Sequence, residues 1–273
     1  MNTQQSVWSA ASGWLVGRWR LALICFLLLM IPSIVEAFIW SSRIGLVNYM
    51  SIDKVAKFYL FAQAIGVIWI SIIQLYVIIS VHWALIRNER FSYSVGGLKP
   101  FWSYFWRMTL LALICGFISG FFHGVADFIW GDWSAGLTMV PAIGILLIIS
   151  LSKWGTWLPA SVVGGNSLFA ASKYRGVRTF SDTLLQLVIY NVPLIAAGIF
   201  YSYWIKIHFG NAFYFIIYLQ NHEILHAISI FLNASVYLIF PVIGAALLSR
   251  AYIMSEEMHP IPSNWVNNRQ NAT

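Results

Sequence analysis

The sequence predicts an all-α polytopic membrane protein, and three observations support this prediction. The chain is 60% hydrophobic and only 9% charged, whereas soluble domains are roughly 25% charged. Several apolar segments exceed the roughly 18 residues that mark a membrane helix. These segments do not alternate between polar and apolar residues, as the strands of a transmembrane barrel would.

Six apolar segments are expected to cross the membrane as helices within a single transmembrane domain over residues 1–273. Two pairs of similar stretches, WRLALIC with WRMTLLALIC and SVGGLKPF with SVVGGNSLF, favour an arrangement of three helical hairpins joined by Gly-Gly loops. The predicted spans are residues 21–40, 58–86, 108–129, 137–158, 184–203 and 224–248.

The distribution of Lys and Arg predicts the orientation of these spans. With the N-terminus inside, twelve of the sixteen basic residues fall on the cytoplasmic side, and four fall outside (Arg43, Lys54, Lys57 and Lys206). The positive-inside rule therefore predicts cytoplasmic N- and C-termini in a bacterial inner membrane. It also accounts for the net charge of +7 without a nucleic-acid partner.

Several polar or reactive residues inside the spans are expected to be structural. Cys25 and Cys115 lie in apolar runs and are predicted to be buried small hydrophobes rather than a redox pair. Interhelical hydrogen bonds are expected from the amides Gln63, Gln74, Asn191 and Asn233, with a lined transport path as the alternative.

The stretch NSLFAASKYRGVRTFSDT follows the second Gly-Gly pair and is predicted to form a short amphipathic helix, capped by Asn166 or Ser167. Lys173, Arg175 and Arg178 would then face anionic lipid headgroups. A solvated linker is the alternative.

The stretch LLIISLSKWGTWLPASVVGGNSLFAASKYR resembles a family of uncharacterised bacterial six-helix inner-membrane proteins. That family is related to the membrane domain of some glycerophosphodiester phosphodiesterases. The similar features are a long apolar helix ending near Leu158-Pro159-Ala160, a small-residue turn, a basic amphipathic helix and a further span. The resemblance implies a six-helix membrane fold without established chemistry, and we expect no soluble phosphodiesterase domain.

The sixth span begins with His222-Glu223-Ile224-Leu225-His226, which has the spacing of the H-E-x-x-H zinc-protease signature. In that motif both histidines bind zinc and the glutamate is the general base. A third ligand is required, and the downstream candidates Glu256, Glu257 and His259 lie about 30 residues away, beyond the other end of the span.

A second pair of groups could supplement the motif on the predicted outer side. His123 and Asp127 are one helical turn apart, as are His222 and His226. These four residues are the candidate ligands of a divalent metal, the only cofactor that the sequence suggests. The alternative is that they lie at the water interface or pair with neighbours, together with Glu36, Asp53, Asp132 and His208.

The sequence thus favours a non-catalytic inner-membrane protein that scaffolds a membrane complex or organises lipids. Its expected partners are membrane lipids and either other membrane subunits or a second copy of the chain. The alternatives are a small-solute or ion transporter and a metal-binding membrane protein, with an H-E-x-x-H protease the least favoured.

One substitution tests the protease alternative directly. We expect Glu223→Gln to leave membrane levels and assembly unchanged, because a structural protein has no use for a catalytic base at this position. Membrane levels are measured by immunoblotting of membrane fractions. A defined proteolytic activity that disappears in this variant at normal membrane levels would contradict the expectation.

Overall fold

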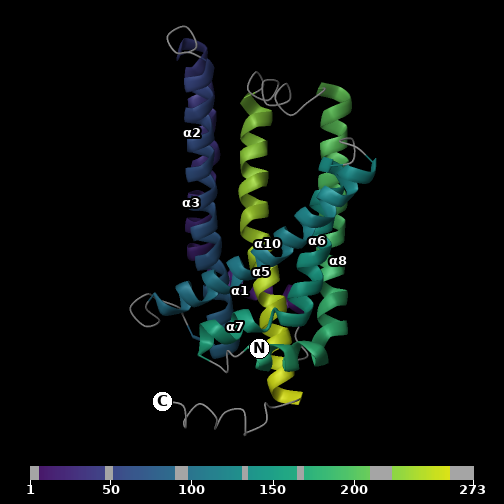
Figure 1. Cartoon of the computed structure of the whole chain (residues 1–273). Coiled ribbons are helices and arrows are strands. Elements are labelled where there is room, and N and C mark those ends of the chain that lie inside the picture. The colour runs from purple at the N-terminus through teal and green to yellow at the C-terminus, as the bar shows by residue number, and fades with distance from the viewer. Residues whose placement is uncertain are drawn as a thin grey trace. The chain divides into compact units, whose positions relative to one another are not determined.

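The computed structural model describes residues 6–46, 52–89, 98–130, 135–164, 169–209 and 223–258. These residues form eight α-helices and no strand, which confirms the predicted all-α class (Figure 1). The helices are α1 (Val7–Gly17), α2 (Trp19–Leu46), α3 (Ile52–Arg87), α5 (Lys99–Trp130), α6 (Ala135–Trp154), α7 (Trp157–Val163), α8 (Phe169–Phe209) and α10 (Glu223–Met258).

Three stretches of the described helices are long and apolar enough to cross a membrane: Ala64–Arg87, Lys99–Ile118 and Ile224–Glu257. Two bent helix pairs, α1 with α2 and α6 with α7, would raise the number to five if each pair is one span. The helices are therefore compatible with a membrane protein of several spans. Six spans, the hairpin arrangement and the location of the termini stay predictions.

The contacts between residues gather into two compact units. Unit 1 comprises Met1–Ala11, Ile79–Tyr201 and Gly244–Thr273, and unit 2 comprises Ser12–Ile78 and Ser202–Ile243. The single transmembrane domain over residues 1–273 stays a prediction.

Unit 2 is held together by ring contacts and by hydrogen bonds from side chains to the backbone. Gln74 of α3 donates to the Tyr237 carbonyl of α10 at 3.1 Å, which confirms the interhelical bond expected of this amide. Trp69 Nε1 donates to the Leu28 carbonyl at 2.9 Å. Asn233, by contrast, is exposed, so the bond predicted for it is not formed in the described residues.

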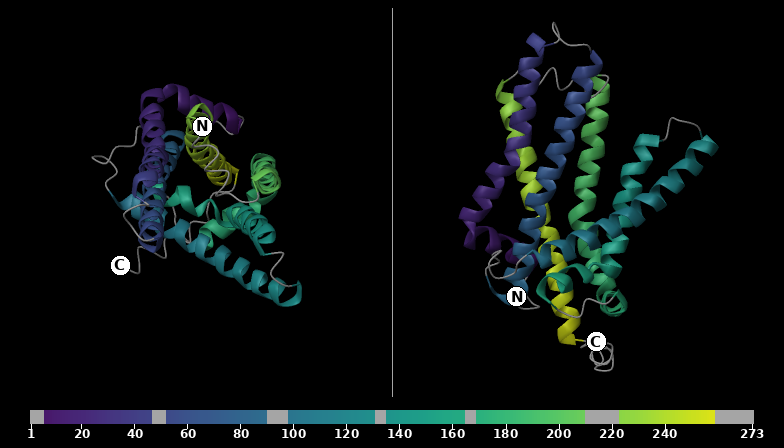
Figure 2. Two further views of the ribbon diagram at one scale, coloured as in Figure 1. Left: turned by 90° about the horizontal axis from the view of Figure 1, so that it is seen from above. Right: turned by 60° about the vertical axis from the view of Figure 1, so that its left-hand side comes forward.

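In unit 1, α5 packs against both α6 and α7, and α5 and α6 run side by side in every view (Figure 2). Cys115 of α5 is buried beside Ser150 of α6, with 3.4 Å between Sγ and Oγ. Cys25, in unit 2, is also buried, and both thiols are free. The prediction that the two cysteines act as buried small hydrophobes is therefore confirmed.

The fourth predicted span, residues 137–158, is not one straight helix. Helix α6 ends at Trp154, and α7 leaves at an angle of 52° to it. Gly155 marks the break: a Cβ there would lie 2.2 Å from the Leu151 carbonyl oxygen and 2.6 Å from a methyl group of Leu248. Pro159 is tolerated because it lies in the first turn of α7, where its missing N–H has no helical acceptor.

The basic segment after α7 also differs from its prediction. Residues 169–209 form one continuous helix of 41 residues, α8, instead of a short interfacial helix followed by a separate span. Arg175 is fully buried within unit 1 and does not face headgroups, whereas Lys173 and Arg178 are exposed. The predicted caps Asn166 and Ser167 lie outside the described residues.

Candidate functional site

Five polar side chains from three helices form close contacts within unit 1. Helix α10 contributes Ser249, Tyr252 and Glu256, which share one helical face because they are three, four and seven residues apart. Helix α3 contributes His82 and helix α8 contributes Arg175. We call these five residues the buried polar cluster.

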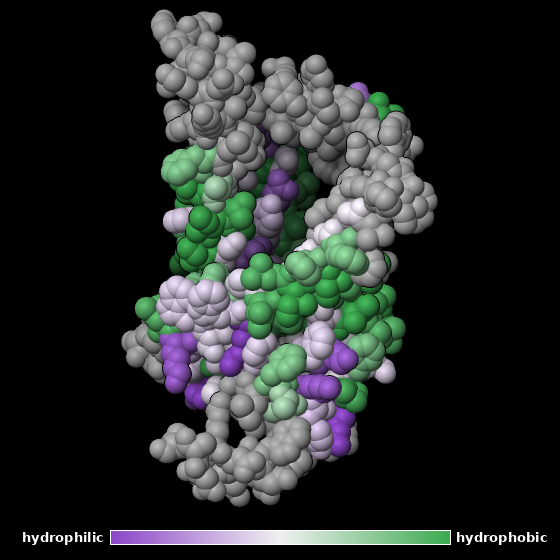
Figure 3. All heavy atoms as spheres, viewed as in Figure 1, coloured by the Kyte–Doolittle hydropathy of each residue, from purple (hydrophilic) through white to green (hydrophobic). Residues whose placement is uncertain are grey.

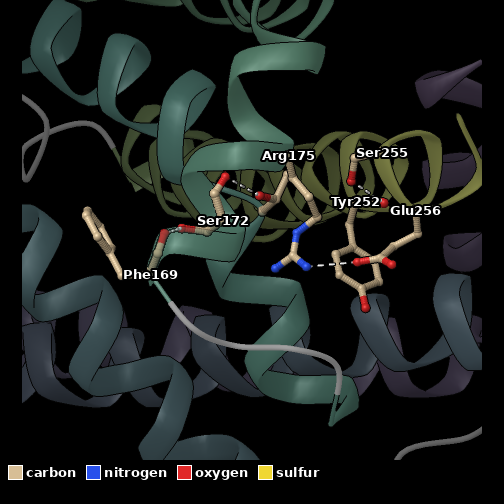
Figure 4. A network of polar contacts seen from close by, with 7 residues as sticks. Phe169, Ser172, Arg175, Tyr252, Ser255 and Glu256 are labelled. Atoms are coloured by element: carbon tan, nitrogen blue, oxygen red, sulfur yellow. Dashed lines mark hydrogen bonds and ion pairs between the residues drawn. The ribbon is translucent and has the colours of Figure 1, made fainter. Parts of the chain in front are cut away.

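The buried ion pair of this cluster joins α8 to α10. Arg175 Nη1 lies 2.8 Å from Glu256 Oε1, and the guanidinium carbon lies 5.1 Å from the centroid of the Tyr252 ring (Figure 4). Arg175 has no exposed surface, whereas the Glu256 side chain is 34% exposed. The carboxylate and the ring thus help to stabilise a cation that water does not reach.

His82 links α3 to α10 in the same cluster. Its Nδ1 lies 2.7 Å from Ser249 Oγ, and its ring centroid lies 5.7 Å from that of Tyr104 on α5. All three side chains are buried, and His82 Nε2 has no hydrogen-bond partner among the described residues. With one nitrogen already unpartnered, the imidazole depends strongly on its bond to Ser249.

We expect Ser249→Ala to destabilise the protein by about 1–3 kcal/mol, because it leaves His82 Nδ1 buried without a partner. The measurement is the thermal unfolding midpoint of the purified protein in detergent. Ser152→Ala is the matched control: Ser152 is equally buried, but its hydroxyl donates only to the Ile148 carbonyl of its own helix. Equal midpoints for the two variants would contradict the role given to His82.

Most other hydroxyl groups near this cluster are bonded within their own helices. Ser172, Thr179 and Ser255 donate to carbonyls three or four residues earlier in the chain, at 2.8, 3.3 and 2.7 Å. Thr156 is an exception, because its hydroxyl donates to the Ser172 carbonyl of α8 at 3.4 Å. Three of these four hydroxyl groups therefore have their partner within their own helix, and Thr156 alone bonds to a different segment.

The carboxyl end of α7 is held by an arginine from α3. Arg87 donates from both Nε and Nη2 to the Val163 carbonyl, with the Nε bond at 3.2 Å. Gly164 ends α7 with φ of 76°, a conformation that glycine adopts without strain, and its N–H donates to the Ala160 carbonyl. The cation also compensates the partial negative charge at this helix end.

A second group of side chains lies where α6, α7 and α8 meet. Phe169 of α8 stacks on Trp154 with 5.8 Å between centroids and meets Trp157 edge-on at 5.2 Å. A basic side chain also lies near each tryptophan ring. Lys153 Nζ is 5.3 Å from the centroid of the Trp154 ring, and the Arg107 guanidinium carbon is 5.0 Å from that of the Trp157 ring. We call these five residues the aromatic–basic cluster.

The described part of unit 1 has an excess of positive charge. It carries eight Lys and Arg side chains but only four Asp and Glu side chains. Hydrophilic side chains gather toward the lower end of the face drawn in Figure 3, and a hydrophobic surface lies above them. The described part of unit 1 therefore has a positive formal net charge.

The predicted metal ligands fall mostly outside what the structure describes. His123 and Asp127 belong to α5, but their side chains are not among the described ones, and His222 lies outside the described residues. His226 of α10 is half-buried. Among the described residues, no group of three or more His, Cys, Asp and Glu side chains could hold a metal ion.

The continuity of α10 bears on the protease motif. The helix runs without interruption from Glu223 to Met258, so thirty residues of helix separate His226 from Glu256. Glu256 is bound instead to Arg175 in the buried polar cluster. That Glu256 is not a third ligand of the motif stays a prediction.

Sequence reasoning did not single out the buried polar cluster. His82 and Ser249 stand in apolar segments, and polar residues at such positions are candidates for a structural or functional role. Their pairing could not be predicted, because 167 residues separate them.

No family model, curated protein or solved structure matches this chain.

Proposed function

We propose that this chain is a non-catalytic protein of the bacterial inner membrane, with six spans and both termini in the cytoplasm. It organises anionic lipids at its inner end and provides a scaffold for other membrane subunits or a second copy. The observation that carries the proposal is the aromatic–basic cluster, in which Lys153 lies near the Trp154 ring and Arg107 lies near the Trp157 ring. Both tryptophan rings also contact Phe169. Aromatic and basic side chains of this kind are typical of membrane interfaces.

The exposed surface of the helices supports a lipid environment. Large apolar side chains are exposed along α3, α5 and α10, which water would make unfavourable and lipid tails would solvate. Examples are Val67, Ile68, Leu113, Phe117, Ile224, Phe231 and Leu232.

The buried polar groups favour a scaffold over a transporter. A transport path requires polar groups that face a common space along the bundle. In unit 1, Arg175 instead binds Glu256, His82 binds Ser249, and most nearby hydroxyl groups bind carbonyls of their own helices. Such contacts stiffen the helices, which suits a protein that presents a fixed surface to its partners.

Native purification tests the proposal. The full chain would be extracted with its surrounding membrane into polymer nanodiscs, and its lipids and protein partners identified by mass spectrometry. We expect anionic phospholipids enriched over the bulk membrane, or a stable larger assembly. A monomer with a lipid composition equal to that of the bulk membrane and without a partner would overturn the proposal.

A further inference from the structure

The side of α8 that meets α6 and α7 carries three contact residues, Phe169, Ser172 and Gly176. Phe169, Ser172, Lys173 and Gly176 are spaced as i, i+3, i+4 and i+7, so they form one stripe on the helix. Phe169 contacts both tryptophans of the aromatic–basic cluster, and the Ser172 carbonyl accepts the Thr156 hydroxyl bond. Lys173 lies on this same stripe.

Gly176 sets the distance between α8 and the end of α6. A Cβ at this position would lie 1.8 Å from the carbonyl oxygen of Lys153, so only a glycine permits this approach of the two backbones. The close contact brings the lysine of α6 next to the stripe of α8 that carries Lys173. Lys153 of α6 and Lys173 of α8 therefore belong to two helices that meet beside Phe169.

These two cations have no opposite charge within the described part of the chain. The Lys153 ammonium group lies 5.3 Å from the Trp154 ring centroid, and neither Lys153 nor the exposed Lys173 forms an ion pair with a described residue. Phe169 is 47% exposed, so its ring is accessible to a ligand. The first turn of α8 adds the partial positive charge of a helix amino end.

We propose that the junction of α6, α7 and α8 is a binding site for the phosphate headgroup of an anionic phospholipid, held by Lys153 and Lys173 over the ring of Phe169. This inference rests on the proposed function, and it names the lipid group that would bind at the proposed cytoplasmic end of the protein. Ammonium groups bind phosphate oxygens through charge-assisted hydrogen bonds. The aromatic rings and the neighbouring exposed apolar side chains accommodate the glycerol backbone and the acyl chains.

A lipid fits this site better than free phosphate does. Trp154, Trp157 and Phe169 supply a large apolar contact area directly beside the cations, and inorganic phosphate would leave that area without a partner. An amphipathic ligand satisfies both the cations and the rings, as headgroup sites at membrane interfaces do.

The test compares lipid binding by two charge-matched double variants of the full chain. In detergent, native mass spectrometry would titrate phosphatidylglycerol, phosphatidylcholine and inorganic phosphate against the wild type, K153Q/K173Q and K99Q/R178Q. The control pair removes the same net charge from two exposed residues of α5 and α8 that do not lie on the stripe. Thermal midpoints within a few degrees of the wild type verify that both variants fold.

We expect K153Q/K173Q to bind phosphatidylglycerol at least tenfold more weakly than the wild type, and K99Q/R178Q to stay within about twofold. Phosphatidylcholine should bind the wild type more weakly than phosphatidylglycerol, and millimolar phosphate should not displace the lipid. Equal loss in both double variants would overturn the site, and so would displacement by phosphate. If the wild type still retains anionic lipid in nanodiscs, these results would refute the binding site at α6, α7 and α8 but not the proposed function.

Discussion

Gly176→Ala is expected to destabilise the protein by about 3 kcal/mol or more, at the upper end of the cost of overpacking a core. The added Cβ would lie 1.8 Å from the Lys153 carbonyl oxygen and 2.6 Å from its carbonyl carbon. Because the clashing atoms belong to the backbone, no rotamer change relieves the contact, and α8 must move away from α6. The measurement is the thermal unfolding midpoint together with the monodisperse fraction after gel filtration in detergent.

Gly116→Ala is the matched control for this prediction. Gly116 is also a helical glycine of unit 1, but a Cβ there would have no atom within 4 Å. Alanine favours a helix over glycine by about 1 kcal/mol, so the control should be neutral or slightly stabilising. Equal midpoints for the two alanine variants would contradict the close approach of α8 to α6.

The second large effect concerns the ion pair between Arg175 and Glu256. The test is the order of the thermal stabilities of the variants that break this pair. Glu256→Ala removes the carboxylate and leaves the cation of Arg175, which has no exposed surface, without its counter-charge. Breaking a buried pair in this way costs about 3–5 kcal/mol. Arg175→Met should cost less, because the remaining carboxylate of Glu256 is 34% exposed and can be hydrated.

The double variant completes this comparison. R175M/E256A removes both members of the pair, so it should be more stable than Glu256→Ala alone, since apolar groups of similar volume often replace a buried pair without loss. Thermal midpoints of the three variants in one detergent give the coupling between the two residues. Additive effects, or a larger loss for Arg175→Met than for Glu256→Ala, would show that Glu256 does not neutralise Arg175.

Composition and run length were sufficient to predict helix at the six apolar segments. Five of the six predicted spans fall inside a single helix, because a long apolar segment has few ways to satisfy its backbone other than an α-helix. The sequence pattern also held a signal that was not used. Val7, Ala10, Ala11 and Trp14 are buried and follow helical spacing, which could have predicted α1.

The breaks and continuations of helices were harder to predict, because they depend on neighbouring helices. Gly155 permits the turn between α6 and α7, and contact with Leu248 of α10 leaves no space for a side chain there. Helix α8 continues through a segment with four basic or acidic side chains among its first fourteen residues, a composition typical of an interfacial helix. Local patterns carry no information about these distant contacts.

The sequence by itself determined the helical class, the apolar helices long enough to cross a membrane, and the burial of the two cysteines. These properties follow from composition and from the period of the apolar residues, which act locally along the chain. Only the tertiary structure decided that Arg175 is buried against Glu256 and that His82 contacts Ser249. It also decided that the backbones of α6 and α8 lie close together at Lys153 and Gly176. The physical reason is that each of these contacts joins residues of different helices, so its free energy depends on packing geometry that no single segment encodes.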